Sequence, residues 1–415
     1  MPATALALLA TFVLMQLFSQ GVTLLNLRQM REKGLMVPPE LAGHADESTL
    51  SRMQAYESDK AKFGIGTSLF DTAVSVVFLF GGLLAWYDGW LRSFDLPFIF
   101  GGLLFVLLLY IAGEIIDIPF ALYRTFSIEA RHGFNTMTFR GWLLDFVKSM
   151  LISFVIMSLV VTAALWLVQA SPMYWWFCVW LFLLCFSLFV MYMAPYVIEP
   201  LFNKFEPVQD EMLAQKIVAL CAKAGIHASG VQQMDASKRS RHSNAYFTGI
   251  GRVKRIVLYD TLLAQMTHEE ILAMLAHEIG HWKKRHILKS IFLIQMFSFA
   301  GLYAAYQLAQ GDVMGNLFGI DFRTLMAKVV LMSFIGGIVM FPLRPLMLVW
   351  SRRNEREADR FSFALTGDSE SMATSLIKLS KENLSNLHPH PLYVALHYSH
   401  PPIVERVKTI RSFRK

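Results

Sequence analysis

Residues Ser149 to Ile198 read SMLISFVIMSLVVTAALWLVQASPMYWWFCVWLFLLCFSLFVMYMAPYVI, a run of apolar sequence without one charged side chain. A helix that crosses a bilayer needs about 20 apolar residues, so this run is too long for a single crossing. Pro172 interrupts the helical hydrogen-bond ladder and disfavours helix at Ser171. The run therefore predicts a hairpin of two membrane-spanning helices.

The composition of the whole chain is also typical of a membrane protein. Hydrophobic residues make up 55% of the 415 positions and charged residues only 17%, and the mean hydropathy is +0.44, which does not suit a soluble chain of this length. The 3 cysteines are too few for a disulfide scaffold and form no CxxC pair. Any metal site must therefore use His, Asp or Glu.

Five further apolar segments bring the predicted crossings to seven. The segment Met1–Leu27 is uncharged and lacks the basic start of a signal peptide, so we expect a retained first helix. The other four lie at 66–87, 96–113, 290–311 and 328–348. We expect a mainly α-helical protein with seven transmembrane helices.

The positive charge falls almost entirely on one side of these crossings. The alternating segments 28–65, 119–143, 199–289 and 344–415 hold 34 of the 38 Lys and Arg residues. By the positive-inside rule the amino terminus lies outside and these segments lie in the cytosol. This distribution accounts for the net charge of +7 without a nucleic-acid partner, and membrane lipid is the expected surrounding.

Three acidic residues, Asp71, Glu114 and Asp117, lie in or at the ends of predicted spans. An ionised group that faces lipid is costly, so they should face protein or water. For Glu114 and Asp117 the alternative is a position beside the lipid headgroups, whereas Asp71 favours a hydrated interior.

A metal-binding motif precedes the sixth span. Residues 277–281 read HEIGH, and His277 and His281, four residues apart, can reach one metal ion from the same helical face. In zinc hydrolases of this pattern the intervening carboxylate, here Glu278, takes a proton from a water that the metal acidifies. Thr267 and Glu270 have the spacing of a capping box, which predicts a helix start. The alternative is a chance pair of exposed histidines.

The third ligand must come from elsewhere, because His286 lies about 140° away round a continuous helix. Glu355 and Asp359 follow the seventh span and share one helical face. One carboxylate can bind the metal while the other accepts the Nδ1–H of a ligand histidine. The alternative is a solvated charged helix.

Strand-like runs at Asn244–Phe247 and Ile256–Tyr259 flank a glycine-containing basic segment and predict a β-hairpin. The edge of such a hairpin can bind an extended peptide by strand addition. We expect Asn244, Ala245 and Tyr246 to contact substrate, with a plain structural hairpin as the alternative.

Together these residues resemble the integral-membrane CAAX prenyl protease family, zinc metallopeptidases with an HExxH motif and a downstream Glu ligand. The matching segments are HEIGHWKKRH (277–286), SRRNEREAD (351–359), RHSNAYFTGIGRVKRIVLYDTLL (241–263) and SHPPIVERV (399–407), with weaker ones at 59–65, 126–135 and 198–207.

The resemblance implies a role for each matching residue. His277, His281 and Glu355 would bind Zn²⁺, Glu278 would be the general base, and Asp359 would support a ligand histidine. His400 and Arg406 would stabilise the oxyanion or anchor its surroundings, although His400 can also be read as a loop histidine. The helices of such proteins enclose a large water-filled chamber.

We divide the chain into five transmembrane helices with their loops (1–200), a cytosolic zincin-like catalytic region with the hairpin (201–288), helices six and seven (289–350), and a Glu-ligand helix with a catalytic tail (351–415). The leading hypothesis is a membrane zinc endopeptidase that removes the last three residues of prenylated CAAX proteins. It would act from the cytosolic face of a bacterial plasma membrane or endoplasmic reticulum membrane.

Two other functions stay open. One is a quality-control zinc protease for misfolded or stalled proteins, since no segment identifies a prenyl pocket. The other is a non-catalytic channel, transporter or scaffold, which the intact motif disfavours.

Overall fold

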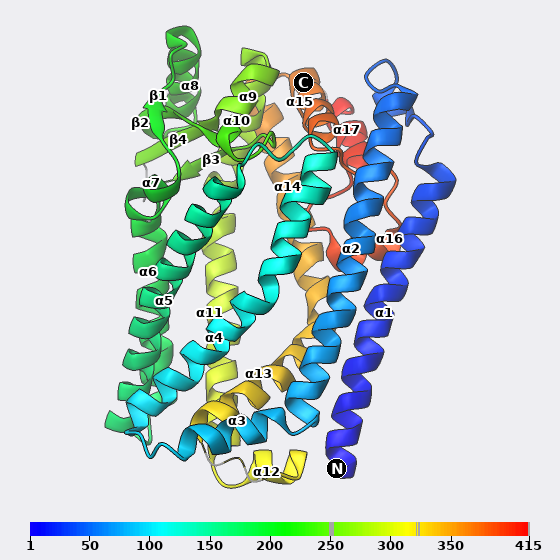
Figure 1. Ribbon diagram of the computed structural model, residues 1–415. Coiled ribbons are helices and arrows are strands. Elements are labelled where there is room, and N and C mark those ends of the chain that lie inside the picture. The colour runs from blue at the N-terminus through cyan, green and yellow to red at the C-terminus, as the bar shows by residue number, and fades with distance from the viewer. Residues whose placement is uncertain (249–252, 321, 323, 414–415) are drawn as a thin grey trace.

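Seven long apolar helices dominate the structure (Figure 1), a computed structural model that describes residues 1–248, 253–320, 322 and 324–413. They are α1 (Ala3–Lys33), α2 (Glu47–Phe80), α4 (Phe98–Tyr123), α5 (Phe139–Ala170), α6 (Trp175–Val197), α11 (His286–Ala309) and α13 (Leu325–Met340). Each belongs to a segment long and apolar enough to span a membrane. The predicted seven-helix, mainly α fold is confirmed.

The uncharged run forms the predicted hairpin, because α5 ends at Ala170 and α6 begins at Trp175. The second span differs from its prediction of 66–87. Helix α2 ends at Phe80, and the chain turns at Gly82, whose φ of 86° is left-handed and suits glycine. A separate helix, α3 (Leu83–Arg92), follows. The prediction was wrong there because the apolar residues of α3 extend the hydropathy signal beyond the turn.

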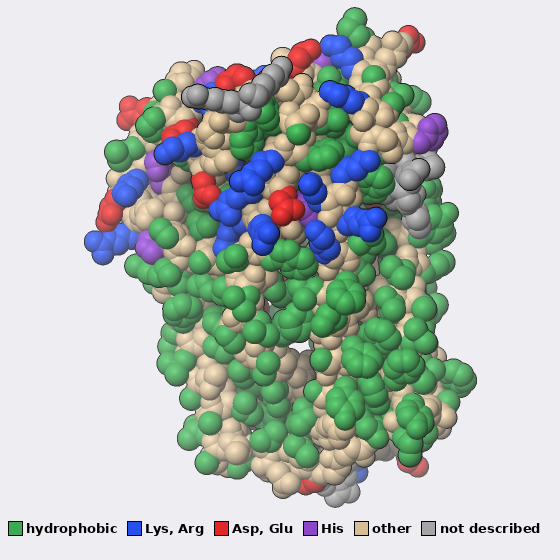
Figure 2. Space-filling model, turned by 180° about the vertical axis from the view of Figure 1, so that it is seen from behind, with side chains coloured by type: hydrophobic (Ala, Val, Ile, Leu, Met, Phe, Trp, Pro, Cys, Tyr) green, Lys and Arg blue, Asp and Glu red, His purple; other side chains and the backbone are tan. Residues whose placement is uncertain are grey.

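Apart from one apolar core cluster that joins α2, α3, α4 and α13, the long helices bury few of their residues and surround an open interior. In their most apolar windows only 0–17% of the residues are buried, whereas a solid bundle would bury the inward face of every helix. Figure 2 shows an opening in the apolar surface of the helical part. Asp71, on α2, has an exposed side chain, and its orientation toward water or protein stays a prediction.

A compact cap lies at the end of the molecule opposite the amino terminus (Figure 1). Its sheet has the order β1-β2-β4-β3, from strands β1 (Phe205–Pro207), β2 (His227–Met234), β3 (Ala245–Thr248) and β4 (Val253–Tyr259). Strands β2 and β4 are parallel, and the two edge strands are antiparallel to their neighbours. The predicted hairpin is therefore β3–β4, with Ala245 opposite Leu258, while its predicted glycine turn at 249–252 lies outside the described residues.

The cap is held by apolar packing between this sheet and α8 (Glu211–Lys223), α9 (Asp260–Gln265) and α10 (His268–Lys283). Ile217, Ile256, Leu258 and Leu275 are fully buried in one cluster. Each such side chain contributes about 1.5–3 kcal/mol relative to an exposed one. The sheet and α10 therefore form one rigid support.

The carboxyl-terminal part completes the cap. The seventh apolar helix leads through a turn at Phe341–Leu343 into α14 (Arg344–Thr366), which rises out of the apolar zone. It is followed by α15 (Ser369–Glu382), α16 (Pro391–His397) and α17 (Ile403–Arg411), and α12 (Val313–Phe318) lies at the opposite end of the molecule (Figure 1). Helix α14 thus connects the spanning helices to the cap.

Candidate metal centre

Helix α10 starts at the predicted capping box and presents two faces. The Thr267 side chain accepts a hydrogen bond from the Glu270 backbone, and the Glu270 carboxylate accepts one from the Thr267 backbone. Ile271, Leu275 and Ile279 recur along one face and pack in the core of the cap. Because that apolar face is anchored, His277 and His281 are held in fixed positions on α10.

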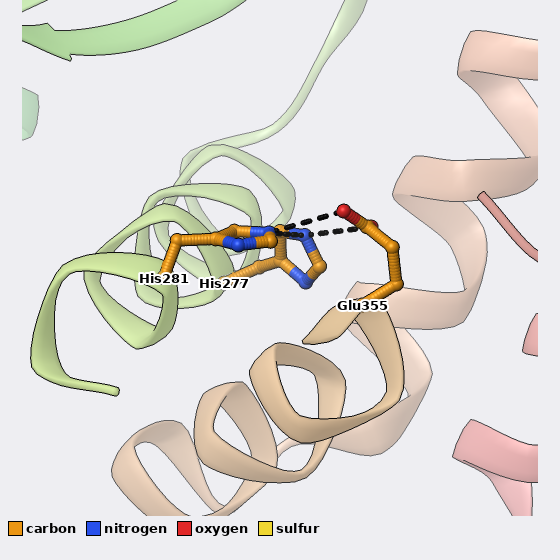
Figure 3. Close-up of side chains that lie close together, drawn as sticks. All are labelled: His277, His281 and Glu355. Carbon is orange, nitrogen blue, oxygen red and sulfur yellow. Dashed lines mark hydrogen bonds and ion pairs between the residues drawn. The ribbon is translucent and has the colours of Figure 1, made fainter. Parts of the chain in front are cut away.

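A glycine lets α14 approach α10 closely. A Cβ atom added to Gly280 would lie 3.0 Å from the Cα atom of Ala358 and 3.2 Å from its carbonyl oxygen. Only small residues permit this separation. The close approach brings Glu355 on α14 to the two histidines of α10 (Figure 3).

The three side chains converge on one point. His277 Nε2 lies 3.1 Å from His281 Nε2, and the Glu355 oxygens lie 3.3 Å from His277 Nε2 and 3.2 Å from His281 Nε2. A tetrahedral zinc site with ligand bonds of roughly 2.0–2.1 Å has edges of about 3.3 Å. Glu355 Oε2 is moreover buried without a hydrogen-bond partner. The donor set therefore fits a zinc ion.

Asp359 and Arg406 support His277 from behind. His277 Nδ1 lies 2.8 Å from Asp359 Oδ1, which fixes the Nδ1–H tautomer and directs the Nε2 lone pair toward the other ligands. Arg406 is buried and donates to both oxygens of Asp359, at 2.6 and 3.0 Å. Burial disfavours the charged form of His277, but its bonds to Asp359 and Glu355 prevail and raise its pKa to about 9. The two carboxylates thus favour a positive charge at His277 Nε2, which either a proton or a metal ion bound to its lone pair would supply.

A second support, through His286, was missed from the sequence. His286 Nδ1 lies 3.0 Å from His281 Nδ1, and His286 Nε2 lies 3.3 Å from Glu357 Oε2. If Glu357 accepts the Nε2–H, His286 Nδ1 can accept the Nδ1–H of His281, so His281 Nε2 keeps its lone pair.

The assumption of one continuous helix through His286 was wrong. Helix α10 ends at Lys283 and α11 begins at His286, while Arg285 has a left-handed φ of 55°. This turn brings His286 back beside His281. The sequence did contain a signal for this second support, because a third carboxylate, Glu357, lies between Glu355 and Asp359 on the same segment.

Glu278, which lies between His277 and His281 in the sequence, has a carboxylate that no other side chain of the centre engages. Among the described residues it makes no hydrogen bond or ion pair, whereas Glu355, Glu357 and Asp359 are all engaged with histidines. Burial raises the pKa of Glu278 above its ordinary value. Such a carboxylate is a stronger base than an exposed one.

His400 and Arg406 occupy different positions at the centre. His400 Nε2 lies 3.3 Å from Glu355 Oε1, and 61% of its side-chain surface is exposed. Its Nδ1 lies 2.9 Å from Ser399 Oγ. Arg406 instead is buried against Asp359, with Nη1 3.6 Å from Glu355 Oε2. Of the two, His400 is the one open to a ligand.

The candidate substrate residues lie on or beside β3, an edge strand of the sheet. Asn244 is exposed, and its carbonyl oxygen accepts a hydrogen bond from the Tyr259 backbone. Ala245 is buried. Tyr246 donates its hydroxyl proton to Glu199, at 2.8 Å. The backbone edge of β3 that pairs with no described strand, rather than the Tyr246 hydroxyl, is thus the feature that suits a peptide.

Comparison with known proteins covers nearly the whole chain. A family model described as CAAX prenyl protease N-terminal, five membrane helices, matches residues 26–204. A second model, peptidase family M48, matches residues 207–414. The two models meet at the start of the cap sheet.

Relatives match over similar lengths. CAAX prenyl protease 1 homolog of Arabidopsis thaliana is 35% identical, over 94% of this chain and 93% of its own. CAAX prenyl protease 1 of Saccharomyces cerevisiae is 32% identical, over 90% and 88%. The crystal structure of S. mikatae Ste24p superposes with a TM-score of 0.91, at 28% identity and over 99% of both chains.

Proposed function

This chain belongs to the CAAX prenyl protease group of peptidase family M48, metallopeptidases of the membrane, and we propose that it cleaves prenylated CAAX carboxyl termini with a zinc ion. The observation that carries the proposal is the convergence of His277, His281 and Glu355 within 4.8 Å of one another, beside the uncommitted carboxylate Glu278.

We assign the zinc ligands to His277, His281 and Glu355. Bound zinc would polarise the scissile carbonyl and lower the pKa of the attacking water. Asp359 holds the tautomer of His277, and His286 with Glu357 holds that of His281. Each of the two histidines would thus hold the metal through Nε2.

Proton transfer falls to Glu278. Its carboxylate takes a proton from the attacking water and delivers it to the leaving amine. The raised pKa of Glu278 suits both steps, since the same group must accept and then release the proton. Glu278→Gln should therefore abolish cleavage while the zinc content stays the same.

His400 and Arg406 take separate roles. The exposed His400 donates a hydrogen bond to the oxyanion that forms during attack, because its ring stands beside Glu355 and remains open to substrate. Arg406 anchors Asp359 from the interior of the cap. Next to them, the edge of β3 binds the peptide backbone as an added strand near Asn244, Ala245 and Tyr246.

The substrate class is proposed from the relatives, which are CAAX prenyl proteases by name. The open interior supports it, since a prenylated carboxyl terminus needs a route at membrane depth to the metal. We further place the catalytic end in the cytosol, because 34 of 38 Lys and Arg residues lie in segments on that side of the spans.

A paired-peptide assay tests the proposal. A farnesylated CAAX peptide and its unprenylated twin are incubated with the full protein, with and without a zinc chelator, and with Glu278→Gln as the inactive control. We expect cleavage of the farnesylated peptide alone, lost with chelator and restored by zinc. Equal cleavage of both peptides would replace this substrate class by the quality-control function, and an active Glu278→Gln variant would refute the mechanism.

A further inference from the structure

Four exposed cations form a patch behind the metal centre. Lys284 and Arg285 lie at the corner between α10 and α11, and Lys289 lies in the first turns of α11. Arg353 of α14 joins them through Glu357, since Arg353 Nε lies 3.6 Å from Glu357 Oε1 and Glu357 contacts His286 of α11. We call Lys284, Arg285, Lys289 and Arg353 the basic patch.

The patch borders the apolar zone directly. The next residues of α11 include Ile287, Leu288 and Phe292, which are 55%, 61% and 68% exposed. They open a helix that is long and apolar enough to span a membrane. Figure 2 shows Lys and Arg side chains gathered along the border between the cap and the apolar surface on the face that it presents.

From this juxtaposition we propose that the basic patch binds the anionic headgroup of a phospholipid whose acyl chains lie against Ile287, Leu288 and Phe292. Four or more cations beside the end of a spanning helix attract anionic headgroups. A nucleic acid or an acidic peptide would match the charge but would leave the adjoining hydrocarbon surface uncovered. A phospholipid matches both surfaces with one molecule.

Glu357 does not neutralise the patch. Its carboxylate is shared between Arg353 and the buried His286, so most of the positive charge stays available to a ligand. The patch is separate from the proposed chemistry, because within the described part of the chain its cations form no ion pair or hydrogen bond with His277, His281 or Glu355.

Native mass spectrometry of the full detergent-solubilised protein tests the proposal. The protein is titrated with phosphatidylglycerol or with phosphatidylcholine of the same acyl chains, at low and high salt. We expect wild type to prefer phosphatidylglycerol, and salt to reduce the preference. Lys284→Gln/Arg285→Gln/Lys289→Gln should weaken phosphatidylglycerol binding about 150-fold, at about 1 kcal/mol for each cation near the surface and about 1.4 kcal/mol per factor of ten, and leave phosphatidylcholine binding unchanged.

The matched control replaces three cations elsewhere in the cap by Gln and should keep the preference for phosphatidylglycerol. These cations are Lys216 on α8, Lys381 on α15 and Lys408 on α17. Zinc content of every variant reports the integrity of the fold, and Lys284→Gln/Arg353→Gln serves as a second patch variant if the triple variant loses zinc. An unchanged preference in a patch variant that retains zinc would overturn the proposal. Tighter binding of polyglutamate than of phosphatidylglycerol to the same cations would overturn it as well.

Discussion

Replacing His286 by Phe should weaken zinc binding without removing a zinc ligand. The Phe side chain fills a similar space but cannot accept the Nδ1–H of His281, which His286 faces at 3.0 Å. His286 is buried and His281 is only partly exposed, so water does not readily replace the lost acceptor. An unpaired buried donor costs about 1–3 kcal/mol.

The expected size of the effect follows from that cost. A tenfold change in affinity corresponds to about 1.4 kcal/mol, and loss of a group that orients a ligand histidine typically costs about 10- to 100-fold in metal affinity. The zinc dissociation constant of His286→Phe should therefore rise by about 10- to 100-fold. Glu357→Gln, which changes no volume, should give a smaller rise because its amide oxygen can still accept a hydrogen bond.

Competition with a chromophoric chelator measures the zinc affinity of each purified variant. The exposed His227 of β2 provides the control, and His227→Phe should bind zinc as wild type does. Because His286 and Glu357 act on His281 in series, the double variant should be little worse than His286→Phe alone. Wild-type affinity in both single variants would refute the argument that this pair sets the tautomer of His281.

Three further results are expected. Burial raises the pKa of Glu278 above 4.5, and the base acts in its deprotonated form. The value of kcat/KM should therefore rise with pH, with a midpoint above pH 4.5. A midpoint at or below pH 4.5 would contradict the assignment of Glu278 as the base. Arg406→Met removes the guanidinium partner of the buried Asp359, which keeps its contact with His277 Nδ1, and should cost about 3 kcal/mol of stability; thermal denaturation measures this, with the exposed Lys408→Met as a control near zero. Ile256→Ala, in the apolar core of the cap, should destabilise the protein by about 2–5 kcal/mol. Thr267→Ala, which removes the N-cap side chain of α10, should destabilise it by about 1 kcal/mol. Equal losses of stability in the two variants would contradict the apolar packing described for the cap.

The sheet of the cap combines one pairing between neighbouring strands with one between strands that are distant in the sequence. The sequence predicted strands at Asn244–Phe247 and Ile256–Tyr259, and their antiparallel pairing is present. It did not predict that β2, which comes earlier in the chain, pairs in parallel on the other side of β4. Hairpin pairing is encoded by neighbouring residues, whereas a parallel partner is selected by the packing of α8 and α9 against the sheet.

The number of spans and the distribution of charge were determined by the sequence alone. The thickness of the bilayer sets how many consecutive apolar residues form a span, and the placement of Lys and Arg sets its orientation. Both are local properties of the sequence. The HEIGH motif likewise needs only the period of one helix to place His277 and His281 on a common face. For these features, no distant part of the chain is involved.

The full set of side chains at the metal centre depends on long-range packing. Glu355 reaches the histidines because Gly280 and Ala358 let α10 and α14 approach within contact distance. His286 joins them because the chain turns at Arg285 in a left-handed conformation. Both depend on how helices distant in the sequence pack against one another, and packing of that kind is fixed by the shapes of many side chains together rather than by the pattern of any one segment.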